Sequence, residues 1–311
     1  MPDVLQLLGL GAPPTEIPPV NQFWLPAFHV ELDALALVLV MLGVYFTTAN
    51  QLQRTGRAYP LSGRQAWCWV AGCATILVGS SWPIHDLSEH YLFAVHMAQH
   101  MLYIFVAAPL LLMGLPDWLA DALIGHGRWR KVVAFLTRPF IAFVVFNVGQ
   151  GITHVPEVTQ AIVTNHPLHF LVHLYIVASA LLLWWPVLSP LPDMPRLSYP
   201  FQMLYLMLQS VIPTVIYAPL TFAEGVVYPF YGQAPHLWGL NAVLDQQMAG
   251  LLMKIGGGFI VWAWIGAVFM RWVARAETAT TNDEFSPISD LTAASAVRAA
   301  EDVVRKGQQQ G

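Results

Sequence analysis

Two pairs of histidines, His96 with His100 and His169 with His173, have the most chemically informative spacing in this sequence. Each pair is four residues apart, so on a helix the two imidazole rings lie on one face, about 6 Å apart along the axis. Both pairs fall in long hydrophobic stretches, where ionisable groups are costly and commonly mark functional sites. Imidazole ligates metal ions and haem iron. The spacing therefore predicts a buried metal or haem site.

Thioether side chains accompany the first pair. Met97 and Met101 each follow a histidine by one residue, about 100° round the helix. Imidazole together with thioether is a ligand set that suits copper, particularly Cu(I). The alternative for each methionine is core packing, and the alternative for a lone intramembrane histidine is a hydrogen bond between helices. Copper is nevertheless the metal that this combination favours.

Residues at the ends of other hydrophobic stretches could join the site. His154 opens a His-x-Pro sequence, Asp245 opens Asp-Gln-Gln, and Met248 lies three residues further on. Asp245 could be a ligand, an acceptor for an imidazole N–H, a proton carrier, or an acid favoured by the dipole of its own helix. We expect the surface histidines to be loop residues or accessory ligands: His85, His90, His166 and His236. The predicted metal ligands and their helpers are His96, His100, His169, His173, His154, Met97, Met101 and Asp245.

Haem is the rival ligand. One histidine from each of two facing helices could ligate a single b-type haem. Two-haem membrane cytochromes carry ligand pairs in both leaflets, whereas here the inner half of the hydrophobic stretches contains no histidine, so at most one haem fits. A copper permease is a third possibility, and the same lack of ligands in the inner half argues against a continuous pathway for it.

The composition predicts the elements that must position these residues. The 311-residue chain is 56% hydrophobic and only 10% charged, with a mean hydropathy of +0.55, whereas soluble domains carry about 25% charged residues. A membrane-spanning helix needs about 20 apolar residues. We therefore predict an all-α, polytopic membrane protein with the lipid bilayer, and not nucleic acid, as its surroundings. Seven stretches qualify as spans, roughly 32–50, 66–83, 91–115, 136–154, 167–187, 201–222 and 245–271.

The distribution of basic residues predicts the orientation. Of the 14 Lys and Arg residues, all but Lys254 lie in or beside alternate loops and the C-terminal tail. The positive-inside rule then places the N-terminus outside and the C-terminus in the cytoplasm, with ten of the eleven histidines on the outer side. We expect a periplasmic, Pro-rich arm over 1–30, which lacks the basic start of a cleavable signal peptide, a seven-helix transmembrane domain over 31–272, and a cytoplasmic polar tail over 273–311.

Several motifs in order resemble one family over roughly residues 20–272. The motifs are His96-Met97-Ala98-Gln99-His100-Met101, Ala108-Pro109-Leu110-Leu111, Gly114-Leu115-Pro116, His154-Val155-Pro156, His169 to His173 leading to Trp184-Trp185-Pro186, and Asp245-Gln246-Gln247 with Gly250. They resemble the CtaG-type, caa3-type cytochrome c oxidase assembly factors, which are multi-span bacterial proteins. Lys254 follows Met253 where many relatives are expected to have an aromatic residue, and the sequence identifies no partner for this mid-membrane lysine.

The resemblance implies a non-enzymatic role in the maturation of a haem–copper oxidase in the bacterial plasma (inner) membrane. The expected cargo is copper, handled on the outer side. The expected partners are cytochrome c oxidase subunits and periplasmic copper chaperones.

Overall fold

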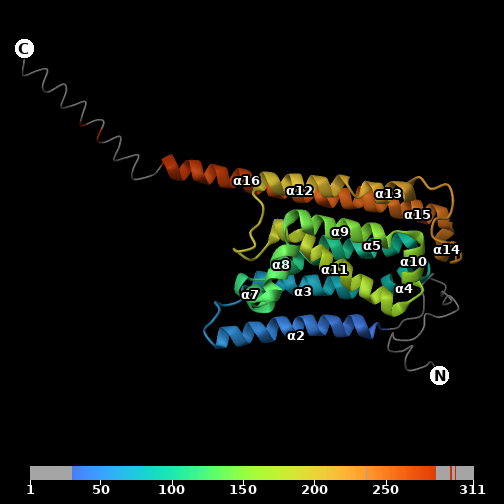
Figure 1. Ribbon diagram of the computed structural model, residues 1–311, viewed down its shortest axis with the longest axis horizontal. Helices are drawn as coiled ribbons and strands as arrows, with labels where there is room; N and C mark the ends of the chain where they lie inside the picture. Colours follow the sequence, from blue (N-terminus) through green and yellow to red (C-terminus); the bar gives the residue numbers. More distant parts are fainter. Residues whose placement is uncertain (1–29, 236, 285–294, 296–297, 299–311) are drawn as a thin grey trace, which may run out of the picture.

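The computed structural model describes residues 30–235 and 237–284, together with residues 295 and 298. Within these ranges every regular element is a helix, so the predicted all-α class is confirmed. The predicted N-terminal arm, including His29, and His236 lie outside the described residues, as does most of the predicted cytoplasmic tail. The helices form an elongated bundle in which most axes run along one direction (Figure 1).

Five helical segments are long and apolar enough to cross a membrane. They are α2 (Leu32–Arg54), the segment Phe93–Gly114, α11 (His166–Leu188), the segment Tyr199–Thr221 and the segment Ala242–Glu277. Two bent helix pairs raise the number to seven when each pair counts as one span. They are α3 (Gly63–Gly79) with α4 (Ile84–His90), bent by 45°, and α8 (Arg128–Leu136) with α9 (Pro139–Thr153), bent by 75°. The predicted direction of the chain across the bilayer stays a prediction.

Proline explains why spans two and four are bent rather than continuous. The predicted stretch 66–83 ends as helix at Gly79, and Pro83, which has no N–H to donate, precedes α4. The predicted stretch 136–154 starts at the last residue of α8, and after a break at residues 137–138 α9 begins at Pro139, which occupies its first turn. Residues 84–90, expected to be a loop, therefore form a helix, and this helix contacts α5.

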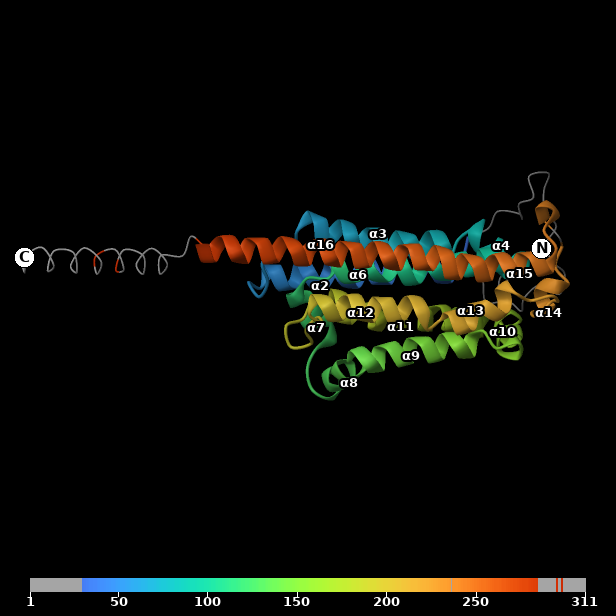
Figure 2. The same cartoon turned by 90° about the horizontal axis from the view of Figure 1, so that it is seen from above.

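Three spans are built from consecutive helical pieces. The segment Phe93–Gly114 comprises α5 (Phe93–Leu102), a π-helical turn η1 (Tyr103–Ala107) and α6 (Ala108–Gly114). The segment Tyr199–Thr221 comprises α12 (Tyr199–Val211) and α13 (Thr214–Thr221). The last span comprises α15 (Ala242–Leu251), the π-helical turn η3 (Leu252–Gly256) and α16 (Gly257–Glu284). At about 1.5 Å per residue its 36-residue apolar segment is roughly 54 Å long, so α16 projects beyond the other helices (Figure 2).

Close helix packing sets the positions of the spans. α3 packs on α6, α9 on α11, α12 on α16, and α5 on α15. Gly114 allows the first contact, because a Cβ there would lie 2.5 Å from the backbone nitrogen of Trp69. The indole N–H of Trp184 on α11 donates to the carbonyl of Ile104 over 2.7 Å, within the π-helical turn of span three. Spans three and five are therefore adjacent in the core.

Lys254 lies in the second π-helical turn. Its ammonium group donates to the Thr214 hydroxyl at 2.7 Å and to the Ser210 carbonyl at 3.2 Å. Both acceptors flank the break between α12 and α13, where Pro213 interrupts the regular hydrogen bonding of the span. Lys254, for which the sequence identified no partner, thus has two hydrogen-bond acceptors at the break between α12 and α13.

Short helices close the two ends of the bundle. At one end lie α4, α10 (Pro156–Val163) and α14 (Pro229–Gly232) (Figure 1). At the other end α7 (Asp117–Ile124) lies beside α8. We call the first of these the α4–α10–α14 end. The 3-10 turn η2 spans Leu237–Gly239.

Candidate metal centre

The two predicted histidine pairs face each other across α5 and α11. The ring centroids within each pair are 4.3 Å apart. Between the helices, the His96 and His169 rings stack at 5.3 Å, and the His100 and His173 rings lie 5.2 Å apart, edge to face. His96, His100 and His169 are buried and His173 is half-buried. Four imidazoles thus converge at one level in the bundle.

Three of the four form the tightest group. One nitrogen from each of His96, His169 and His173 lies within 4.8 Å of the other two. Three neutral imidazoles at such separations can ligate one ion after small side-chain adjustments, since metal–nitrogen distances are about 2.0–2.1 Å. We refer to these three residues as the triad.

A carboxylate orients His169. Its Nδ1 lies 2.9 Å from Oε1 of Glu89, and because a carboxylate only accepts, Nδ1 carries the proton. Nε2 is then the lone-pair nitrogen, and it is buried without a hydrogen-bond partner among the described residues. A carboxylate behind a histidine is the usual arrangement for a metal ligand.

A tyrosine, Tyr231, orients the ring of His96 in a similar way. Burial raises the pKa of Tyr231 well above its usual value, and the nearby Glu89 charge adds to this, so the hydroxyl keeps its proton. That proton is donated to the Ser88 carbonyl at 2.8 Å. The hydroxyl oxygen, 3.2 Å from Nδ1 of His96, therefore accepts from the imidazole. Nε2 of His96 is left with the lone pair that a metal requires.

His154 is held in the same tautomer near the triad. Its Nδ1 donates to the Gln150 carbonyl over 2.7 Å. Its Nε2 is buried and has no hydrogen-bond partner in the described part of the chain. A cavity of about 10 Å³ is lined by His154 together with His96, His100 and His169. The structure thus places His154 beside the two predicted pairs.

His85 has a different role from the triad. Its Nδ1 accepts from the Gln99 amide over 3.1 Å, so its lone pair is already engaged. Its Nε2 faces Oε2 of Glu89 at 3.5 Å. The ring is buried and lies 5.8 Å from that of His169, although the sequence indicates a loop position. The packing of α4 on α5 explains the difference.

Glu89 and Tyr231 are the residues of the candidate site that sequence reasoning missed, and Glu89 makes the most contacts with its histidines. Its carboxylate contacts His85, His166 and His169 at 2.9–3.7 Å. His166, expected in a loop, begins α11 and also lies 3.5 Å from Asp33 on α2. The signal that could have identified Glu89 is its position four residues after His85, which on a helix puts both on one face.

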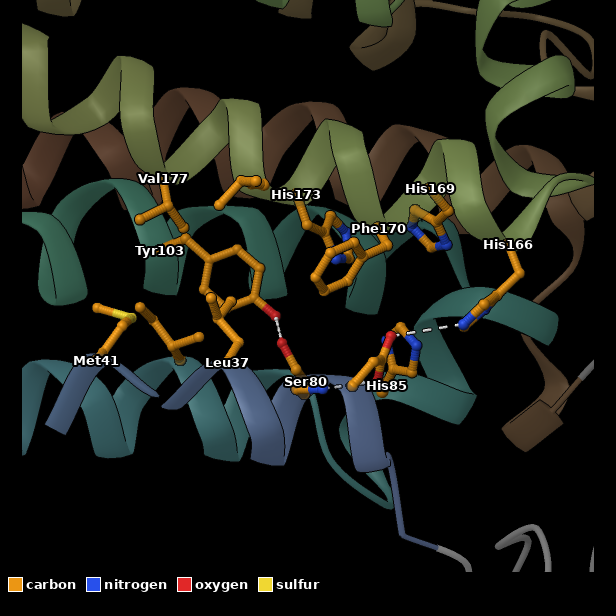
Figure 3. A pocket seen from close by; sticks show the side chains of 14 residues that line it. Leu37, Met41, Ser80, His85, Tyr103, His166, His169, Phe170, His173 and Val177 are labelled. Atoms are coloured by element: carbon orange, nitrogen blue, oxygen red, sulfur yellow. Dashed lines mark hydrogen bonds and ion pairs between the residues drawn. The ribbon is translucent and has the colours of Figure 1, made fainter. Parts of the chain in front are cut away.

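A cavity of about 60 Å³ lies against this group, between α2 and α11 (Figure 3). In Figure 3 the side chains of His166, His169 and His173 descend from α11 toward His85. Tyr103 and Ser80 share a 2.6 Å hydrogen bond at the cavity wall. Two members of the triad, His169 and His173, therefore border an internal space rather than a solid core.

The remaining predicted helpers separate into two groups. Met97 and Met101 are buried and line a cavity of about 20 Å³ with His100 and His154. Asp245 instead accepts the backbone N–H groups of Phe93 at 2.7 Å and Ala94 at 3.0 Å. It therefore caps the N-terminus of α5, a different helix from its own, and holds α15 against it. Met248 is 41% exposed and lines none of these cavities.

Comparison with known proteins places this arrangement in a family. The sequence model of the cytochrome c oxidase caa3 assembly factor (Caa3_CtaG) family matches residues 43–275, which include the triad, His100 and His154. Uncharacterized proteins of Mycobacterium bovis and Mycobacterium tuberculosis are each 27% identical over 266 residues, covering 80% of this chain and 39% of theirs. An uncharacterized protein of Mycobacterium leprae is 23% identical over 255 residues, covering 76% of this chain and 38% of its own length.

The chain spans about two fifths of the length of these curated relatives. No solved structure matches it. The family model nevertheless covers most of the helical bundle and every histidine of the centre, whereas the α2 residues that line the larger cavity precede the match. The chain therefore belongs to the cytochrome c oxidase caa3 assembly factor family.

Proposed function

We propose that this chain is a non-enzymatic assembly factor that binds copper at the triad and passes it to a cytochrome c oxidase subunit. The observation that carries the proposal is the arrangement of His96, His169 and His173, whose ligand nitrogens lie within 4.8 Å of one another. Glu89 and Tyr231 fix the tautomers of His169 and His96, so that both Nε2 atoms present lone pairs. Such preorientation is expected of metal ligands.

The donor set supports copper over harder metals. The triad consists of imidazoles, and the adjacent space is lined by the thioethers of Met97 and Met101. Imidazole and thioether suit copper, whereas Mg²⁺ and Ca²⁺ prefer oxygen ligands. An assembly factor must also release its metal, and a centre with three protein ligands leaves a coordination position free for the incoming ligand of a partner.

The location of the triad supports handling of copper on the outer side of a bacterial plasma membrane. It lies toward the α4–α10–α14 end, whereas the basic residues Arg128, Arg130 and Lys131 lie on α8 at the other end (Figure 1). The positive-inside rule assigns the α8 end to the cytoplasm. Periplasmic copper chaperones are then the expected donors and oxidase subunits the expected acceptors.

The cavity between α2 and α11 offers an approach for the metal. It is lined by Asp33 and His166, and Glu89 lies behind His166 and His169. Carboxylates beside a cleft raise the local concentration of cations. The copper ion would exchange from these carboxylate and imidazole groups to the triad.

A b-type haem is disfavoured by the size of the available space. The cavities beside the four histidines have volumes of about 60, 10 and 20 Å³. By the rule that one water occupies about 10–15 Å³ of such volume, the largest holds roughly five waters, far fewer atoms than a porphyrin. The His96 and His169 rings also stack on each other, so no macrocycle can lie between them.

Copper content of the purified protein tests the proposal. Protein in mild detergent is loaded with Cu(I), desalted and assayed by mass spectrometry, and its absorption spectrum is recorded. The variant carrying His96→Ala and His169→Ala is expected to lose the copper ion that is bound at the triad while remaining folded. His126→Ala, an exposed histidine between α7 and α8, is the matched control and is expected to keep it. Unchanged copper in the folded double variant, or a haem Soret band in the wild type, would contradict the proposal.

A further inference from the structure

Two small cavities continue from the triad on the side of α5 that faces α9 and α10. The first, of about 10 Å³, is lined by His96 and His169 of the triad and also by His100 and His154. The second, of about 20 Å³, is lined by His100 and His154 but by no member of the triad. The two imidazoles shared by these cavities connect the triad to a separate internal space.

Three thioethers border that separate space. Met97 and Met101 come from α5, and Met253 comes from η3 in the last span. All three are buried, and they belong to one packed cluster. Hydrophobic packing alone explains a buried methionine. It does not explain why the imidazole nitrogens of His100 and His154 lie among three methionines.

Those nitrogens lack partners. His100 is 6% exposed, and neither of its ring nitrogens has a hydrogen-bond partner among the described residues. A neutral imidazole has one donor and one acceptor, and a buried group with neither satisfied calls for an unseen ligand. Nε2 of His154, whose Nδ1 is fixed by Gln150, is the third such nitrogen.

The lining selects the ligand. Among the residues that the structure describes, no carboxylate lines this cavity, and its volume of about 20 Å³ accommodates roughly one water-sized species. Thioether and imidazole donors without carboxylates match Cu(I), which accepts soft ligands and low coordination numbers. Zn²⁺ is held in proteins by imidazole, thiolate and carboxylate groups rather than thioethers, and the hard cations Mg²⁺ and Ca²⁺ prefer oxygen ligands.

We infer that Met97, Met101, Met253, His100 and His154 form a second, sulfur-containing Cu(I) position beside the nitrogen-only triad. The inference rests on the proposed function, because the triad supplies or receives the ion. Cu(I) moves between the positions by exchanging imidazole ligands across the 10 Å³ cavity, one metal–nitrogen bond forming as another breaks, without change of oxidation state. The protein thereby holds two copper ions in neighbouring sites of different softness.

Anaerobic Cu(I) titration against a chromogenic chelator, combined with X-ray absorption at the copper edge, tests this inference. The wild type is expected to bind two Cu(I) ions per chain and to show copper–sulfur scattering. The variant carrying Met101→Leu and Met253→Leu preserves side-chain volume. It is expected to bind one ion and to lose the sulfur signal. Met248→Leu replaces an exposed methionine of the same span and is the matched control.

The outcomes separate this inference from the proposed function. One ion with only nitrogen scattering in the wild type would overturn the second position and leave the triad standing. A single ion in the wild type that is ligated by sulfur and is retained in the variant carrying His96→Ala and His169→Ala would overturn the triad and support the second position. Two ions and undiminished sulfur scattering in the folded Met101→Leu, Met253→Leu variant would overturn the assignment to these methionines. Absence of bound Cu(I) in the wild type would overturn both.

Discussion

The carboxylate of Glu89 accepts a hydrogen bond from Nδ1 of His169 over 2.9 Å, and the two residues are 80 positions apart in the chain. The bond holds the proton on Nδ1 and leaves the buried Nε2 without a hydrogen-bond partner among the described residues. Glu89 contacts His85 and His166 as well, so one carboxylate organises the imidazoles behind the triad.

Replacing Glu89 with Gln is expected to weaken copper binding about 10- to 100-fold, the usual effect of losing a partner behind a ligating histidine. The amide keeps the shape but removes the charge, and it can present an N–H where the imidazole needs an acceptor. Competitive Cu(I) titration measures the change. Glu157→Gln, an exposed glutamate on α10, is the control and should leave the affinity unaltered. Equal affinities for the wild type and Glu89→Gln would show that this carboxylate does not tune the site.

Asp245→Ala is expected to destabilise the bundle by about 1–3 kcal/mol, because the N–H groups of Phe93 and Ala94 lose their acceptors at the start of α5. Asp245→Asn retains one acceptor oxygen, so it should destabilise the bundle less than Asp245→Ala does. Thermal unfolding in detergent gives the order of stability as wild type, Asn, then Ala. An Ala variant as stable as the wild type would contradict the capping role.

Lys254→Met is expected to reduce stability by roughly 1 kcal/mol, since the Ser210 carbonyl and the Thr214 hydroxyl lose their donor at the break in span six. Thr214→Val removes one acceptor from the same group. In a double-mutant cycle, the loss of unfolding free energy in the double variant should be smaller than the sum of the losses in the two single variants. Strict additivity would mean that Lys254 and Thr214 do not interact.

Gly114→Ala and Gly43→Ala form a matched pair on α6 and α2. A Cβ at Gly114 would meet the Trp69 backbone nitrogen at 2.5 Å, so the contact between α3 and α6 must open, at a typical overpacking cost of about 1–3 kcal/mol. A Cβ at Gly43 has no heavy atom within 4 Å, so this change is expected to be neutral or stabilising by up to about 1 kcal/mol. Melting temperatures of the two variants measured side by side check the difference. Equal effects would count against the packing of α3 on α6.

The sequence by itself determined the features that depend on local spacing. A four-residue separation puts His96 with His100, and His169 with His173, on single helix faces in any structure where those segments are helical. Long apolar stretches required helices, because backbone polar groups in a bilayer must be satisfied internally. The sequence marked the end of the second span at Pro83, but it did not predict the break before Pro139 or the bends of 45° and 75°.

The tertiary structure decided how those faces meet and what surrounds them. Span three pairs with α11 through η1 and α6, and this pairing depends on packing among several helices. No periodicity in one segment specifies its neighbour. Partners that matter for the site lie far away in the chain. Tyr231, which fixes the tautomer of His96, is 135 residues from it, and Asp245 is 152 residues from the N–H group of Phe93 that it caps. Sequence reasoning placed Asp245 near the histidines by depth, yet only the arrangement of α15 beside α5 directs its carboxylate to backbone N–H groups. Hydrogen bonds of this kind are short-range and directional, so they follow from the assembled bundle and not from the order of residues.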